Sequence, residues 1–427
     1  MKKKILFSLE NFNNPYIAEF IKKLESKYDV HIISSKKNYN LQYKNIKVLN
    51  YNYTFTDKII DKICILFSNV HKSKKQKIYF QFQIEQEKNI FLKLLLNLKL
   101  ILSYFKFLPD MDILYKQLYK FYSVEKKFFD RYELFIYDFR LFEEHNNCKR
   151  YIYSAINHKN TKTVSWVYSW DNIFTFSTIK SSDFFIVWCD YIKKITQKIH
   201  KISHHKIYLN YPMQFYYLRD KPKNYNNDYL LFACSYNGNE NNLKDYVVDD
   251  LNMIKLIIKI IKKNNLNIKV LVRPYPYVKY KKLIALIKKN QKIIKFDFNS
   301  YNFYKKNSSL KIHLKQKKKQ ILNSIAVLSF GSTFNIESSI LNKPTFHIDF
   351  SDVKRKNDLY QYSNFSKNLD EFEYLKRYKC KNIIKNSKQL KNILIDLSKN
   401  KTKSYLGYGS YLSKKFTKIN NKQIFLK

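Results

Sequence analysis

The sequence is poor in glycine and proline, and this scarcity excludes several classes of nucleotide-binding and fibrous protein. Only 4 glycines and 7 prolines occur among 427 residues, whereas average usage of about 7% glycine would give about 30. The glycines are Gly238, Gly331, Gly407 and Gly409. None of their spacings matches the Walker P-loop or the G-x-G-x-x-G fingerprint. A P-loop hydrolase, a Gly-rich dehydrogenase, and collagen-like, Gly/Ser-linker or Pro-rich chains are therefore excluded.

Cysteine is also scarce, and its spacing gives no sign of a cross-linked or zinc-binding scaffold. The five cysteines are Cys64, Cys148, Cys189, Cys234 and Cys380. They are odd in number and far apart, and they form no C-x-x-C pair, which argues against both kinds of site. The apolar run before Glu10 is too short for a signal peptide, so we expect a cytoplasmic location.

Acidic residues are few relative to basic ones. The chain has 80 Lys and Arg against 34 Asp and Glu, a formal net charge of +46, which is typical of proteins that contact nucleic acid or an anionic membrane. Enrichment in Lys, Asn, Ile, Tyr and Phe, with depletion of Gly, Ala and Pro, is also typical of AT-rich genes. Because no basic and aromatic nucleic-acid module is present, we expect no nucleic-acid partner. Peripheral contact with the inner face of the cytoplasmic membrane stays open, and the basic run 315–319 is expected to form a solvated helix surface.

The longest apolar stretch covers residues 89–109. Lys93, Lys99 and Lys106 interrupt it, and each opposes placement at the centre of a bilayer. The segment is therefore not expected to cross a membrane. Two alternatives remain, a helix packed within a domain and a basic amphipathic helix in the membrane interface.

Strands and helices alternate along the chain in two series, which predicts an α/β protein with two Rossmann-like domains facing across a cleft. We expect an N-terminal domain at 1–217 with a helical insertion at about 54–129, a linker at 218–228, a second domain at 229–400 and a tail at 401–427. Expected strands are 4–9, 30–33, 132–139, 163–168, 183–188, 206–209, 229–235, 268–272, 293–298 and 326–330. Expected helices include 190–200, 251–264 and 280–289.

The segment 324–350 carries the most informative motif. The apolar strand 326–330 leads into Gly331, Ser332 and Thr333, and a helix containing Glu337 follows. A glycine at this junction lets a phosphate approach the backbone, and the start of a helix offers free N–H groups and a positive dipole. A carboxylate one turn later can accept hydrogen bonds from ribose hydroxyls. Alternatively, the hydroxyl residues only cap the helix and Glu337 is solvated.

Three stretches together resemble GT-B glycosyltransferases of bacterial surface-polysaccharide pathways, such as those for capsule and lipopolysaccharide O-antigen. The first is the G-S-T-x-x-x-E motif at 331–337 with the following 343–350. The second is SWVYSWDN at 165–172, with NYPMQF at 210–215. The third is R-P-Y-P at 273–276, where Tyr275 replaces the histidine that the family often has. The resemblance covers most of residues 1–350 and is weakest at 54–129.

This resemblance implies a nucleotide-sugar donor in the second domain and a glycan or lipid-linked acceptor facing the first. It implies no cofactor beyond the nucleotide sugar and no obligatory metal. Arg273 would be the cation for the diphosphate, because its planar fork suits phosphate oxygens. Gly238, in the loop after the first strand of the second domain, is a further donor-side candidate.

Transfer with inversion also needs a base that removes the proton of the acceptor hydroxyl. Glu10, Asp138 and Asp171 follow apolar strands, where residues of a parallel sheet project into a crevice. Asp171 is favoured, with backbone capping in a turn as its alternative. Trp170 could stack on a sugar, but a buried position is favoured, and His347 is expected to be packed rather than catalytic.

Other functions remain possible from the sequence. Asp110 and Asp112 form a D-x-D pattern like the metal site of GT-A enzymes, but it follows a helical run and Pro109 rather than a strand. On the same fold, a CDP-glycerol-type glycerophosphotransferase is the nearest alternative enzyme. A non-catalytic basic protein that binds a membrane surface or nucleic acid is the alternative from another class.

Overall fold

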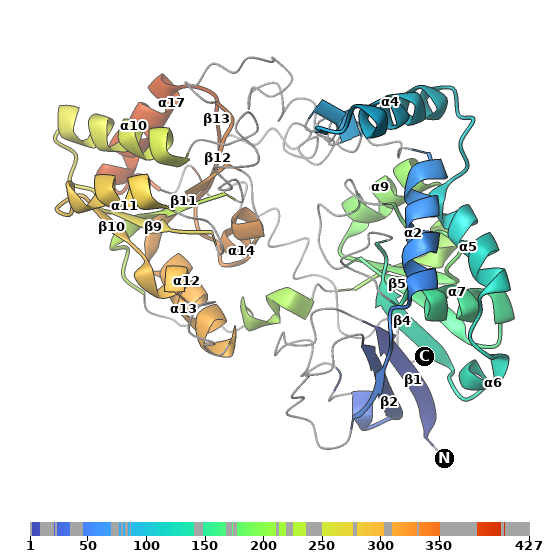
Figure 1. The fold of residues 1–427 in the computed structure, drawn as a ribbon. Helices are drawn as coiled ribbons and strands as arrows, with labels where there is room; N and C mark the ends of the chain where they lie inside the picture. Colours follow the sequence, from blue (N-terminus) through green and yellow to red (C-terminus); the bar gives the residue numbers. More distant parts are fainter. Residues whose placement is uncertain are drawn as a thin grey trace. The chain divides into compact units, whose positions relative to one another are not determined.

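A computed structural model describes most of the chain, and it divides into two compact units. Among the described residues, the boundary between the two units lies between Gln214 and Phe215, and each unit is considered by itself (Figure 1). The described residues are 2–8, 21, 24–34, 46–69, 77, 80–81, 84–85, 87–140, 148–167, 173, 177–210, 213–218, 225–235, 250–275, 280–302, 310–330, 333–350, 382–402 and 405.

The first unit contains a seven-stranded sheet in the order β3-β2-β1-β4-β5-β6-β7. All neighbouring strands are parallel. The strands are β1 (Lys3–Ser8), β2 (Tyr28–Ser34), β3 (Lys47–Asn50), β4 (Leu134–Asp138), β5 (Lys162–Trp166), β6 (Phe184–Val187) and β7 (Ile207–Leu209). Six of the seven overlap the strands expected from apolar runs; β3 was not expected.

Successive side chains of a strand point to opposite faces, so this sheet has a core on each side. In β1, Ile5 and Phe7 belong to one buried cluster, together with Trp166 of β5. Leu6 belongs to the other cluster, which the helices on that face complete. Parallel strands buried on both faces need such continuous apolar sequences.

Helices dominate the described part of residues 54–129, as expected, and α2 and α5 pack on the second of these cores. The helices of this unit are α2 (Phe55–Phe67), α4 (Ile90–Tyr104), α5 (Met111–Phe121), α6 (Lys126–Phe129), α7 (Lys149–His158) and α9 (Asp190–His200), with short 3₁₀ turns η1 (His204–Lys206) and η2 (Met213–Leu218), the latter crossing the unit boundary. Thr54 and Asp57 start α2 with a reciprocal capping box, which satisfies free N–H groups of the first turn.

The second unit contains a six-stranded parallel sheet in the order β10-β9-β8-β11-β12-β13. Its strands are β8 (Tyr229–Ala233), β9 (Val270–Arg273), β10 (Ile294–Phe296), β11 (Ser324–Ser329), β12 (Thr345–Ile348) and β13 (Ile383–Ile384). Its helices are α10 (Asp250–Lys263), α11 (Lys281–Lys288), α12 (Phe298–Asn302), α13 (Leu310–Leu322), α14 (Thr333–Ile340) and α17 (Ser387–Ser398). Both sheets place their first three strands in reverse order before the fourth. This is the Rossmann order, so the predicted α/β class is confirmed.

Several helices end without the glycine that usually adopts a left-handed conformation there. Lys159 follows α7 and Lys201 follows α9, each with φ of 58°. Asn265, Asn342 and Asn400 also have positive φ. In a chain with so few glycines, lysine and asparagine take these positions.

A buried polar network joins the helical insertion to α7. Asp61 of α2 is fully buried and accepts hydrogen bonds from Lys149 Nζ at 2.7 Å and from the Tyr115 hydroxyl at 2.7 Å. One turn earlier, Asp57 accepts from the Tyr51 hydroxyl at 2.8 Å and from the Tyr119 hydroxyl at 3.2 Å. These bonds join α2, α5 and α7, and they compensate the cost of burying two carboxylates.

Removal of the buried ammonium group should destabilise the first unit strongly. Lys149→Met leaves Asp61 as a buried carboxylate without its cation, and we expect the free energy of unfolding to fall by about 3 kcal/mol or more. Urea titration followed by circular dichroism measures this loss.

A double-mutant cycle and a surface control make the test specific. Lys194→Met, on the exposed side of α9, should change stability by less than about 0.5 kcal/mol. Adding Asp61→Asn to Lys149→Met should cost less than the sum of the two single losses, because the partners are coupled. Additive losses would contradict the proposed pairing.

Candidate functional site

The strand orders define where a ligand site is expected in each unit. In a doubly wound sheet, ligands bind beyond the carboxyl ends of the strands, where the strand order reverses. That point lies between β1 and β4 in the first unit and between β8 and β11 in the second. Asp138 ends β4, and Thr333 starts α14 just after β11.

Several predicted site residues follow these strands but lie outside the described residues. Glu10 comes after β1 and Gly238 after β8, while Gly331 and Ser332 join β11 to α14. Asp171 and its neighbour Trp170 also lie outside this part of the chain. Their predicted roles stay predictions.

Asp138 lies at the predicted strand end, but a neighbouring arginine occupies its carboxylate. The Arg140 guanidinium binds both carboxylate oxygens, with Nε 2.8 Å from Oδ1 and Nη2 on Oδ2. The backbone N–H of Arg140 also donates to Oδ1 at 3.0 Å. Both side chains are buried. This bidentate pair holds the turn after β4 and competes with any proton transfer to Asp138.

Arg273 lies at the carboxyl end of β9, as expected for a group near the diphosphate, and it is enclosed by polar partners. Nη1 is 3.2 Å from Asp297 Oδ2 and also donates to the Gln320 side chain. Nη2 lies 2.9 Å from His313 Nε2. Only 4% of its surface is exposed. The guanidinium is therefore fixed in orientation by α13 and by the residue that follows β10.

Glu337 lies on α14, and its two oxygens are engaged by different elements. The Tyr217 hydroxyl, from η2, donates to Oε1 at 2.8 Å, and Lys317 Nζ of α13 is 2.5 Å from Oε2. Glu337 is 3% exposed, so the alternative of a solvated surface residue is wrong. The carboxylate instead connects α13 and α14 to η2.

Lys317 corrects the prediction for the basic run. Residues 315–319 were expected to be a solvated surface, but the Lys317 side chain is 16% exposed. Its Nζ lies 4.5 Å from the centre of the Phe334 ring, and Arg273 lies over the same ring at 5.6 Å. A lysine run on a helix necessarily covers more than one face, because successive residues are about 100° apart. One lysine of the five-residue run therefore faces the interior.

Burial also sets the ionisation of the histidines in this unit. Burial lowers the pKa of His313 to about 3, and the nearby Arg273 and Lys317 add to this effect. Burial alone lowers the pKa of His347, in β12, to about 3. Both rings are thus neutral at pH 7. The buried position of His347 agrees with the prediction of a packed residue.

The D-x-D pattern is used for internal hydrogen bonds. Asp110 pairs with Lys180 at 2.6 Å. Asp112 is buried and accepts from the Tyr153 hydroxyl at 2.8 Å and from the Ser181 hydroxyl at 2.7 Å. The two carboxylates anchor the start of α5 to the segment before β6. Among the described residues, no cluster of three or more His, Cys, Asp or Glu is arranged to hold a metal ion.

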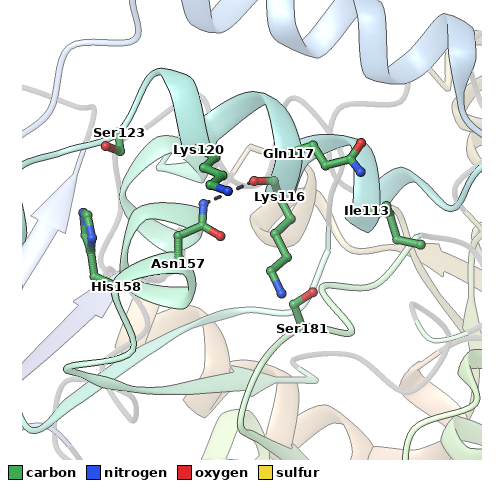
Figure 2. Close-up of a pocket in the computed structure, with 8 residues that line it drawn as sticks. All are labelled: Ile113, Lys116, Gln117, Lys120, Ser123, Asn157, His158 and Ser181. Carbon is green, nitrogen blue, oxygen red and sulfur yellow. Dashed lines mark hydrogen bonds between the residues drawn. The ribbon is translucent and has the colours of Figure 1, made fainter.

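A pocket lies elsewhere on the first unit, between α5 and α7 (Figure 2). Its volume is about 700 Å³. It is lined by Ile113, Lys116, Gln117, Lys120, Ser123, Asn157, His158 and Ser181. Ser181 precedes β6, and His158 ends the helix that leads into β5, so the pocket is near the amino ends of these strands. The switch point lies at the carboxyl ends of the strands, which is the other end of the sheet. The pocket is therefore not assigned as the transfer site.

The residues that the sequence did not single out are Tyr217, His313 and Lys317. His313 and Lys317 are four residues apart on α13, so they share one helix face. That spacing was a usable signal, since a helix leading into the G-S-T strand must pack beside its carboxyl end. Tyr217 gave no signal, because its contact with Glu337 joins residues far apart in sequence.

Comparison with known proteins gives structural similarities only. No protein-family model and no curated protein matches the chain. The wall teichoic acid polymerase TagF is 12% identical, with 98% of this chain and 85% of that chain covered at a TM-score of 0.45. TarM is 11% identical, with coverages of 98% and 96% and a TM-score of 0.46. A UDP-GlcNAc 2-epimerase from Methanocaldococcus jannaschii is 14% identical, with coverages of 97% and 98% and a TM-score of 0.44. Identities and scores are all low, so functional proposals rest on the residues of this chain.

The neutral buried histidines predict a loss of stability in acid. In the unfolded state their pKa is near 6.5, so the unfolded chain binds more protons below that pH and stability falls from about pH 6.5 towards pH 3. At pH 5, each histidine should contribute a loss of about 2 kcal/mol. Replacing His347 by Asn should reduce the pH dependence by about this amount.

Urea unfolding at pH 7 and pH 5 measures the effect. His205→Asn is the matched control, because His205 is exposed in η1 and its replacement should leave the difference between the two pH values unchanged. An equal pH dependence in wild type and His347→Asn would show that this ring is not held neutral.

Proposed function

We propose that the chain is a glycosyltransferase that moves a sugar from a nucleotide-sugar donor to a surface-glycan or lipid-linked acceptor. The observation that supports this best is in the second sheet. The Rossmann strand order brings Arg273, Thr333 and Glu337 to the carboxyl ends of β9 and β11. A phosphate-accepting turn, a cation and a ribose-binding carboxylate are the groups that a nucleotide diphosphate needs.

The diphosphate would be held by the start of α14 and by Arg273. The first N–H groups of a helix are unpaired and carry a partial positive charge, and Thr333 adds a hydroxyl. Arg273 is preoriented by Asp297 and His313, so little side-chain entropy is lost when its guanidinium meets phosphate. When the bond from the anomeric carbon to the phosphate breaks, charge develops on the leaving oxygen. Fixed positive groups stabilise that charge. They would stabilise the leaving group without an obligatory metal ion.

Glu337 would bind the ribose while it remains attached to its protein partners. A carboxylate offers about four acceptor positions, and Tyr217 and Lys317 use two of them. Lys317 and Tyr217 would then act as positioning residues, since they fix the orientation of the carboxylate. Both act through Glu337 in this proposal and need no contact with the nucleotide.

The acceptor proton would be removed by a carboxylate of the first unit. Of the three candidates, Asp138 is engaged by Arg140 through both oxygens. Asp171 and Glu10 therefore remain the favoured bases. Attack by the deprotonated hydroxyl on the anomeric carbon forms the new glycosidic bond and releases the nucleoside diphosphate.

Nucleotide binding should raise the thermal unfolding midpoint. A ligand at about 100 times its Kd stabilises the folded state by about 2.7 kcal/mol, which corresponds to about 5 °C or more for a unit of this size. Differential scanning fluorimetry with UDP-, GDP- and TDP-sugars and CDP-glycerol measures the shift. No shift with any of them would count against the proposal.

Analysis of the product then separates the enzyme classes. Glycosyl transfer leaves the acceptor without added phosphorus. Glycerophosphate transfer from CDP-glycerol adds one phosphorus atom for each glycerol unit transferred. Mass spectrometry of the acceptor distinguishes the two outcomes. A phosphorylated product would contradict the proposed glycosyl transfer and would support the glycerophosphotransferase alternative.

Glu337→Gln should impair donor use, and it should also destabilise the second unit because Lys317 loses its buried carboxylate partner. The amide keeps the shape and the Tyr217 contact but loses the charge, so kcat/KM for the nucleotide sugar should fall roughly ten- to a hundredfold. Glu85→Gln, at an exposed position, is the control and should have full activity. Comparison of unfolding midpoints excludes loss of fold as the cause, and unchanged kcat/KM in a folded Glu337→Gln protein would remove Glu337 from the site.

A further inference from the structure

Helix α4 buries two polar side chains and exposes a row of large apolar ones. Lys99 and Ser103 are its buried residues. The α4 apolar face, as defined here, is formed by exposed side chains at helical spacing. These are Phe91, Leu94, Leu95, Leu98, Ile101 and Phe105, which are 39–69% exposed. A helix packed on a water-soluble core has the opposite arrangement.

Specific contacts fix this orientation. Lys99 Nζ donates to the carbonyl oxygen of Ile65 in α2 and lies 5.3 Å from the Phe80 ring centre. Burial lowers the pKa of Lys99 to about 8. The backbone N–H of Asn69 donates to the Pro109 carbonyl at 2.8 Å, so the segments after both helices are also joined. As a result α4 lies across the end of α2 (Figure 1), and the side chains of its apolar face are exposed.

The charges along α4 and at its two ends are mostly positive, with Glu87 before Lys88 and Asp110 after Pro109 as the acidic residues that flank it. Residues 88–109 contain four lysines and no aspartate or glutamate. With Lys99 turned inward, Lys88 and Lys106 are exposed at the two ends of α4 and Lys93 is partly exposed on its first turns. Phe107 and Tyr104, both more than 70% exposed, lie beside Lys106. Aromatic and lysine side chains together are typical of the interface between lipid headgroups and acyl chains.

The geometry restricts how such a helix can meet a bilayer. With 15 residues, α4 is about 22 Å long, which is shorter than the hydrocarbon core of about 30 Å. No helix in the described part of the chain is both long and apolar enough to cross a membrane. The remaining arrangement lays α4 flat, with its apolar face in the lipid and lysines at the headgroups.

We infer that α4 is the docking surface by which this protein binds an anionic lipid membrane. The apolar face enters the boundary between headgroups and acyl chains, and Lys88, Lys93 and Lys106 bind the lipid phosphates. The anionic lipid is favoured over a protein partner because Lys88, Lys93 and Lys106 are complementary to a uniformly negative surface, whereas the flanking Asp110 is already paired with Lys180. This inference is independent of the proposed transfer reaction, since α4 contains none of the donor-side or base candidates.

Sedimentation with vesicles tests the docking surface. The intact protein should bind vesicles of mixed phosphatidylglycerol and phosphatidylcholine, and more weakly those of phosphatidylcholine alone. Leu94→Glu with Leu98→Glu should lower the partition coefficient at least a hundredfold. Lys88→Gln, Lys93→Gln and Lys106→Gln should each lower it about fivefold on anionic vesicles at low salt, and raised salt should reduce that difference.

Ile312→Glu is the matched control, because Ile312 of α13 is 65% exposed, close to the 63% of Leu94. It should bind vesicles like the wild type. Equal loss in Ile312→Glu, or no binding by the intact protein, would overturn the inference. Light scattering supplies a second readout: a dimer that dissociates in the Leu94→Glu, Leu98→Glu variant would assign the face to a second copy of the chain instead.

Discussion

Parallel strand pairing is the constraint on which the rest of the molecule depends. Two parallel strands cannot be joined by a tight turn, so each connection must cross the sheet and cover one of its faces. All strand ends of one kind then gather at one edge. In both units the strand order reverses beside the first strand, and the connections there diverge to opposite faces. Arg273, Asp297 and the start of α14 come together for this reason, although they are far apart in sequence.

Charge balance explains how the second unit can bury so many polar groups near that edge. Arg273 and Lys317 supply two positive charges, and Asp297 and Glu337 supply two negative ones. Burial keeps His313 neutral between them. Phe334 lies against both cations, and the negative face of its ring attracts them. The cluster has no net charge, and each of its members holds another in place.

Much of this fold could be predicted from the sequence, because a fully buried strand requires a continuous apolar run. The strands expected at 229–235 and 326–330 were evident on that basis and overlap β8 and β11. β3 was not, since Lys47–Asn50 has no buried residue and is defined by pairing with β2. Likewise, Glu337 was found from its place after a strand, whereas Tyr217 and Lys317 were not. For Lys317 the four-residue spacing from His313 on α13 was a usable signal, whereas the contact of Tyr217 with Glu337 joins residues far apart in sequence and leaves no local pattern.

The left-handed residues at the helix ends have a consequence for engineering. A left-handed backbone costs a residue with a Cβ atom roughly 1 kcal/mol more than glycine. Lys159 and Lys201 both adopt it after α7 and α9. Glycine at these two exposed positions would relieve that cost without touching a core or a site. Replacing Lys159 and Lys201 by glycine would therefore raise the thermal stability of the protein. Glycine is the residue type that is scarce in this sequence.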